Sequence, residues 1–223
     1  MCYYTLMFNK PQKWAAKTGI WAQIVLIVSF AVFGLVQGPH YSWLAHSISD
    51  MYADKAPLGS LLVAVITVCG AMTLMFVVFS LWPSVKRAGL SAKLATVLLG
   101  LSIFGVGDLL SPFERLGCRL ADAGCTDSLQ TATTGGRNDM ILSGIGVFLL
   151  MIGVITLGYS ISKLKEFKQV SKLLIYGGYL LILVIVIMGM APVTIYGLME
   201  RLVALLGAVL LALLAKSCLR ATK

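Results

Sequence analysis

Three ionisable residues lie in otherwise apolar stretches of this 223-residue chain: Asp108, Glu200 and Arg201. A charge inside a membrane span costs roughly 2.5–3.5 kcal/mol on insertion scales, so such residues usually face other protein groups and serve a function. Counting residues along each helix places the three at similar depth. The sequence predicts that Asp108 and Arg201 pair between two helices, as a structural staple or as part of a binding site, while Glu200 faces a cavity.

The polar segment HSISD follows the first apolar stretch and contains His46, Ser49 and Asp50. If it is helical, spacings of three and four residues put these side chains on one face. A serine, a histidine and a carboxylate are the components of an activated nucleophile. The interpretation that we favour over this one is a helix-capping serine and an interfacial histidine, because no nucleophile-elbow motif is present. The residues from Trp43 to Tyr52 mix apolar and polar types as an interfacial helix does, and we expect Asp139 at the same end of the molecule.

Cys118 and Cys125 share the short polar loop GCRLADAGC. Thiols this close can form a disulfide outside the cytoplasm, and we expect one here, with two free thiols as the alternative. A zinc site is not expected, because the chain has two histidines, His40 and His46, and no C-x-x-C or H-x-x-x-H spacing. The sequence predicts no metal site and no cofactor.

Six apolar stretches must position these residues. Each is near the ~20 residues that cross the ~30 Å hydrocarbon layer as a helix. Their approximate ranges are 18–36, 58–82, 94–110, 140–161, 173–190 and 194–214. The chain is therefore expected to be all-α, a polytopic transmembrane helix bundle of about six spans that forms a single membrane domain over residues 1–223.

The Lys and Arg residues predict the orientation of the bundle. Thirteen flank the spans on the side of the two termini, four lie on the other side, and Arg201 lies within the last span. Basic residues are retained in the cytoplasm. Both termini are therefore expected in the cytoplasm, with the protein multi-pass in the cell's inner or plasma membrane and the residues described above at its outer face.

The composition agrees with a membrane protein. Hydrophobic residues make up 59% of the chain and charged residues 12%, whereas a soluble domain is about a quarter charged. The formal net charge of +9 does not indicate nucleic-acid binding, because the basic residues flank the apolar stretches instead of clustering with aromatic residues on one face. Membrane lipids are the expected partners, and the oligomeric state stays open.

The order of three motifs resembles a known family: HSISD after the first span, P-F-E-R after the third and G-L-M-E-R in the sixth. The chain resembles the "domain of unknown function 998" family of bacterial multi-span membrane proteins over most of its length. The resemblance implies that His46, Ser49, Asp108, Glu200 and Arg201 match the family's polar positions. Members often have a histidine at the outer start of the fourth span, where this chain has Asn138 and Asp139, so the analogy with membrane hydrolases that hold zinc is weak.

Three functions remain open from the sequence. The favoured hypothesis is a non-catalytic protein with an outward-facing polar pocket that binds a lipid headgroup or a small amphipathic molecule. The second is a membrane-embedded lipid hydrolase or transferase that uses Ser49 or a water as nucleophile. The third is a small transporter in which Asp108 and Glu200 take up protons, for which discontinuous helices would be expected.

Overall fold

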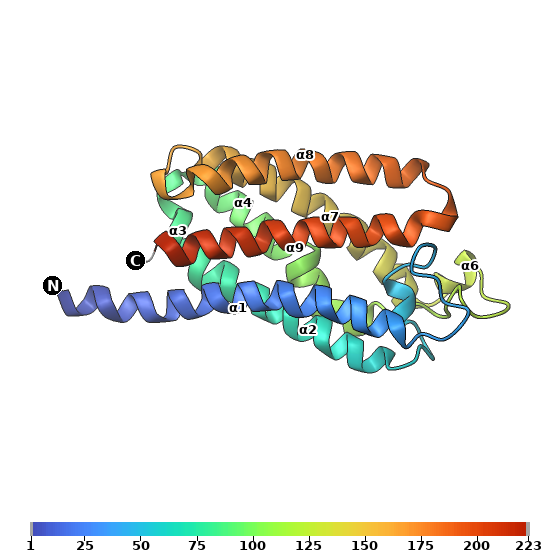
Figure 1. Ribbon diagram of the computed structural model, residues 1–223. Helices are drawn as coiled ribbons and strands as arrows, with labels where there is room; N and C mark the ends of the chain where they lie inside the picture. Colours follow the sequence, from blue (N-terminus) through green and yellow to red (C-terminus); the bar gives the residue numbers. More distant parts are fainter. Residues whose placement is uncertain (1, 222–223) are drawn as a thin grey trace.

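The computed structural model describes residues 2–221, and this part of the chain is all-α, with no strand. Six helical spans, each long and apolar enough to cross a membrane, run back and forth along one axis (Figure 1). They are Lys10–Leu35, Gly59–Ala88, Leu90–Phe113, Thr134–Ile161, Lys165–Met190 and Val193–Ala221. The predicted six-span bundle is therefore confirmed, and both ends of the described chain lie at the same end of the bundle.

The spans form a closed ring in chain order. The first span belongs to α1 (Cys2–Leu35), which packs against both α2 (Gly59–Phe76) and α9 (Tyr196–Ala221). On the other side of the ring, α7 (Thr134–Ile161) packs between α4 (Leu90–Leu101) and α8 (Lys168–Met190), and α8 in turn contacts α9. Large apolar side chains are exposed on the outer surface of the bundle. Such a surface can contact the lipid chains of a membrane.

The helices extend beyond the predicted apolar ranges at several ends. The fourth helix, for example, begins at Thr134 instead of residue 140, and its first turn is capped by Thr133, whose side chain accepts from the backbone N–H of Gly136. The reason is that hydropathy marks only the part of a helix in hydrocarbon, whereas backbone hydrogen bonds and caps extend it into the polar region.

The third span is not a continuous α-helix. After α4 the backbone of Ser102 is extended, with ψ of 175°, and a π-helical turn, η4 (Ile103–Gly107), leads into the short α5 (Asp108–Leu110) and η5 (Ser111–Phe113). The break lies near the middle of the span. Ser102 is fully buried there, and its hydroxyl donates to the carbonyl of Leu99 at 2.7 Å. The π-helical turn ends directly before Asp108.

Two loops close the end of the bundle opposite the termini, which we call the loop end: residues 36–58 and residues 114–133. The prediction of an interfacial helix from Trp43 to Tyr52 is wrong. Only Ser49–Tyr52 is helical, as the 3₁₀ turn η1, and all four of its residues are buried. The segment therefore enters the bundle instead of lying on a membrane surface, because buried carboxylates bind its polar groups, as described below.

Candidate functional site

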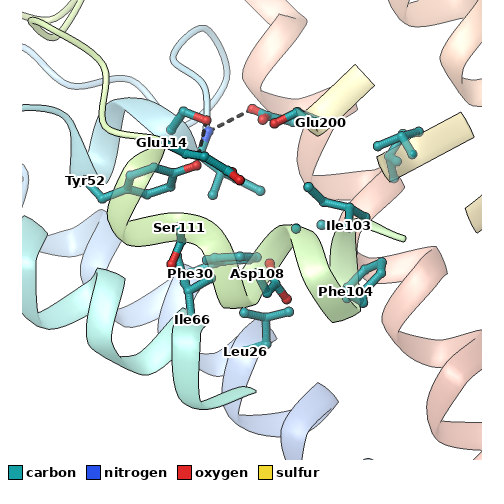
Figure 2. Close-up of a pocket in the computed structure, with 17 residues that line it drawn as sticks. Leu26, Phe30, Tyr52, Ile66, Ile103, Phe104, Asp108, Ser111, Glu114 and Glu200 are labelled. Atoms are coloured by element: carbon teal, nitrogen blue, oxygen red, sulfur yellow. Dashed lines mark hydrogen bonds between the residues drawn. The ribbon is translucent and has the colours of Figure 1, made fainter. Parts of the chain in front are cut away.

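A cavity of about 110 Å³ lies between the helices near the loop end (Figure 2). Its polar lining comprises Ser49, Tyr52, Asp108, Ser111, Glu114, Ser143 and Glu200. Its apolar lining includes Leu26, Phe30, Ile66, Phe104 and Val203. Tyr52, Glu114 and Glu200 occupy the upper part of Figure 2, whereas Asp108 lies in the lower part beside Phe30 and Leu26, so polar and apolar groups alternate around the cavity. Among the described residues, no Lys, Arg or His lines it.

Two carboxylates in this lining lack hydrogen-bond partners. Asp108 is 8% exposed and Glu114 is 2% exposed, and Asp108 Oδ2 and Glu114 Oε1 are both buried without a partner. Burial, together with the nearby charge of Asp139, raises the pKa of Glu114 to about 8. Unpaired buried carboxylates are costly unless they take up a proton or a cation.

Close packing between helices fixes Asp108. A Cβ added to Gly70 of α2 would lie 2.5 Å from the backbone nitrogen of Leu109 and 2.9 Å from the Asp108 Cβ. Only glycine allows this approach, because such short separations are not seen for real Cβ atoms. The interrupted third span therefore rests directly on α2 at the residue that carries the carboxylate.

Carboxylates on two other helices hold η1 over the cavity. Glu200 of α9 accepts a 2.7 Å hydrogen bond from the backbone N–H of Ile48. Asp139 of α7 accepts from the hydroxyls of Ser49 at 3.0 Å and Tyr52 at 2.9 Å, both on the same oxygen. Hydrogen bonds to ionised groups are stronger than neutral ones. The first loop thus forms a roof tied to the fourth and sixth spans.

Arg201 holds the same loop, and the predicted pair with Asp108 is wrong. The Arg201 guanidinium donates to the carbonyls of His46 at 2.9 Å, Gly197 at 2.8 Å and Trp43 at 3.2 Å, and to the hydroxyl of Tyr41. It also lies over the Trp43 ring, 5.5 Å from its centre. No ion pair joins Arg201 to Asp108 within residues 2–221. Depth along the helices does not reveal these contacts, because the carbonyls of His46 and Trp43 lie in the first loop, outside the spans.

The activated nucleophile considered for the first loop is not assembled. The Ser49 hydroxyl contacts Asp139 and Tyr52, whereas His46 Nδ1 accepts from the backbone N–H of Ser42 at 2.9 Å. Neither His46 nor Asp50 lines the cavity. Because the segment is not a continuous helix, the spacings of three and four residues do not bring these side chains onto one face.

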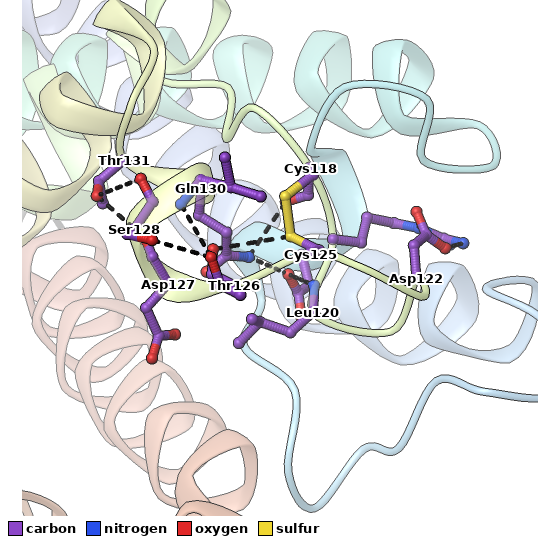
Figure 3. The surroundings of a disulfide bond; sticks show 12 residues. Cys118, Leu120, Asp122, Cys125, Thr126, Asp127, Ser128, Gln130 and Thr131 are labelled. Atoms are coloured by element: carbon purple, nitrogen blue, oxygen red, sulfur yellow. Dashed lines mark hydrogen bonds and ion pairs between the residues drawn. A yellow bond between two sulfur atoms is a disulfide. The ribbon is translucent and has the colours of Figure 1, made fainter.

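Asp50 joins the two loops at the loop end. Its Oδ1 accepts from Gln130 Nε2 at 2.6 Å and from the backbone N–H of Leu120 at 3.1 Å. Burial raises the pKa of Asp50, although these hydrogen bonds oppose the shift. Leu120 lies in the loop closed by the Cys118–Cys125 disulfide, whose Cα atoms are 5.9 Å apart (Figure 3). The predicted disulfide is therefore confirmed, and it fixes a loop that binds the buried Asp50.

The structure thus separates the seven candidate residues into two groups. Ser49, Asp108 and Glu200 line the cavity, and Asp139 binds the roof; the others, His46, Asp50 and Arg201, organise the loops. Sequence reasoning missed Glu114, although it lies in the P-F-E-R motif, because it follows the apolar stretch by a few residues. It also missed Tyr52 and Gln130, for which the sequence carries no signal beyond residue type.

Six apolar spans define a multi-pass membrane protein, and its loop end contains a buried acidic cavity. The family model described as "Protein of unknown function (DUF998)" matches residues 22–217, so the chain belongs to this family, as the motifs predict. No curated protein matches the chain, and no solved structure does.

Proposed function

We propose that the protein binds the headgroup of a membrane lipid, or another small amphipathic molecule, in the cavity at the loop end. The observation that carries this proposal is the mixed lining of the cavity, in which carboxylates and hydroxyls occur together with the apolar side chains of Leu26, Phe30, Ile66 and Phe104. An amphipathic ligand suits such a lining. Its polar group can form hydrogen bonds with the carboxylates and hydroxyls, and its apolar part can pack against the apolar side chains. On the charge rule, the cavity faces the outside of the cell's inner or plasma membrane.

A cavity-filling substitution tests the proposal. Ala204 of α9 lines the cavity, whereas Ala212, two turns further along the same helix, does not. In lipid and metabolite mass spectrometry of the purified protein, we expect a specific amphipathic molecule to copurify with wild type and with Ala212→Phe, but not with Ala204→Phe. If nothing copurifies specifically, or if Ala204→Phe retains the molecule in full, the proposal is wrong.

Transport of such a ligand is a second candidate, favoured by the interruption of the third span at Ser102. Discontinuous helices next to buried ionisable residues are a common feature of transporter binding sites. The extended backbone at Ser102 and the π-helical turn after it lie directly before Asp108. Uptake of the copurifying molecule into sealed proteoliposomes would support transport, and binding without uptake would leave the first proposal alone.

A further inference from the structure

The charges around the cavity at the loop end have one sign. Three carboxyl-bearing residues, Asp108, Glu114 and Glu200, line it, and a fourth carboxylate, Asp139, binds the hydroxyls of its roof. They come from the third, fourth and sixth spans and from the loop that follows the third. When the lining carboxyl groups ionise together, their negative charges repel one another in a poorly screened site, and a bound cation relieves this repulsion.

The nearest basic residues are engaged elsewhere. Arg201, although adjacent to Glu200, donates to the carbonyls of the first loop and of Gly197. Arg115, adjacent to Glu114, donates to the carbonyls of Tyr52 and Ala53 at 2.9 and 3.0 Å. Each arginine therefore binds backbone carbonyls, and neither lines the cavity.

The acceptors that remain point to a ligand with hydrogen-bond donors. Asp108 Oδ2 and Glu114 Oε1 are buried without partners, in residues that are 92% and 98% buried respectively. Glu200 uses Oε2 for Ile48. An ammonium group carries three donors and a positive charge, so it can serve several carboxylates at once. The rings of Phe30 and Phe104 line the same cavity and are compatible with a cation or with an attached apolar group.

We infer that the ligand of this cavity is an amphipathic ammonium, whose positively charged amine binds the unpartnered carboxylates of Asp108 and Glu114. The inference rests on the proposed function and adds the sign of the ligand's charge. The amine belongs either to an aminolipid headgroup or to a free amphipathic amine. In both cases an anionic headgroup is excluded, since it would add negative charge to a site that has no basic lining residue among those described.

Three amphiphiles with the same tail test the charge. Thermal stability of the purified full chain is measured against rising octylamine, octanol and octanoate, because a ligand that binds the native state stabilises it. Octylamine is expected to stabilise wild type at a concentration at least about tenfold below that of octanol, and octanoate not at all. Equal effects of octylamine and octanol would overturn the ammonium inference while leaving the proposed pocket in place. No effect of any amphiphile, together with no copurifying molecule, would overturn both.

Conservative variants locate the effect. Asp108→Asn and Glu114→Gln should each raise the octylamine midpoint about tenfold, since each removes a carboxyl group that can ionise when the ammonium binds. Asp127→Asn, an exposed carboxylate at the same end of the bundle, is the matched control and should leave the midpoint unchanged. An equal shift in all three variants would mean that octylamine responds to surface charge, and the inference would fail.

A lipid competition separates the two sources of the amine. The protein is placed in nanodiscs of equal phosphatidylethanolamine and phosphatidylglycerol, and retained lipid is read by native mass spectrometry. Selective retention of phosphatidylethanolamine supports an aminolipid, and octylamine binding without lipid selection supports a free amine. Selective retention of phosphatidylglycerol, which is anionic, would overturn the inference.

Discussion

At the scale of single residues, neighbours in the sequence have opposite surroundings. Glu200 lines the cavity and accepts from Ile48, whereas Arg201 is directed to the carbonyls of the first loop. Successive residues on a helix point about 100° apart, so this division follows from the geometry of α9. Both side chains nevertheless bind the same loop. The last two residues of the motif G-L-M-E-R therefore both bind the first loop, and Glu200 also lines the cavity.

Because Arg201 binds the first loop and not Asp108, substitutions of these two residues should affect stability independently. Arg201→Ala should lower stability by about 1.5–3 kcal/mol, because it removes charge-assisted hydrogen bonds to several carbonyls. Since Asp108 and Arg201 share no contact, the double variant with Asp108→Ala should lose the sum of the single losses to within about 0.5 kcal/mol. Denaturation in mild detergent measures all three variants. A coupling energy well above that value would indicate a direct Asp108–Arg201 ion pair and contradict this prediction.

Glu114 should make stability depend on pH. Its pKa is raised from 4.5 to about 8 in the folded chain, so between these values the folded state keeps a proton that the unfolded chain has lost. Stability from this group therefore falls as pH rises from about 4.5 to 8, and it is independent of pH on either side of that window. Glu114→Gln removes this dependence. Relative to wild type, the variant should gain about 1–3 kcal/mol between pH 5 and pH 8.

The pH experiment needs the difference between variant and wild type. Asp108, Asp139, Glu200 and Tyr52 face the same region from the other elements, and their own titration enters both curves. Glu166→Gln, an exposed glutamate at the opposite end of the bundle, provides a matched control and should show no such gain. A Glu114→Gln curve parallel to wild type would contradict the buried, unpaired state of Glu114.

At the scale of elements, the sequence predicts helices better than it predicts loops. The six spans follow from long apolar runs, because only helices satisfy every backbone group within lipid. The burial of Ser49–Tyr52 was not predictable in this way, since it depends on Asp139 and Glu200, which lie 90 and 152 residues away from their partners Ser49 and Ile48. The break at Ser102 is likewise absent from the hydropathy pattern, because the residues on both sides remain apolar.

The contact between the first loop and α9 depends on one glycine. A Cβ at Gly197 would lie 2.1 Å from the carbonyl oxygen of His46, and the backbone N–H of Leu198 donates to the Leu44 carbonyl at 3.0 Å. Gly197→Ala should therefore displace the loop and cost about 1–3 kcal/mol. Hydrogen exchange should increase in residues 41–48.

Gly189→Ala in α8 is the control for that substitution, because an added Cβ there meets nothing within 4 Å. It should change stability by no more than about 0.5 kcal/mol and leave exchange in the first loop unaltered. Equal effects of the two substitutions would mean that helix propensity, and not the loop contact, determines the result.

At the scale of the whole molecule, the carboxylates that line the cavity lie near one end of the bundle, and both ends of the described chain lie at the other. The orientation of this arrangement in the membrane is a prediction from charge. In the sequence, thirteen Lys and Arg residues flank the spans on the side of the termini, against four on the other side. Because basic residues stay in the cytoplasm, the cavity should open toward the outside. The same orientation places the Cys118–Cys125 disulfide in an oxidising compartment.

Two exposed positions at opposite ends of the bundle test this orientation. Ala132→Cys lies in the second loop of the loop end, and Ser162→Cys lies between α7 and α8 at the other end. A membrane-impermeant maleimide added to intact cells should label Ala132→Cys, whereas Ser162→Cys should react only after the cells are permeabilised. Both cysteines are introduced into a Cys2→Ser background, in which Cys69 and Cys218 are buried and Cys118 is bonded to Cys125. The reverse labelling would place the acidic cavity on the cytoplasmic side. The amine would then have to come from the inner leaflet or the cytoplasm, and the charge rule would fail for a chain in which thirteen of seventeen flanking cations predict the opposite.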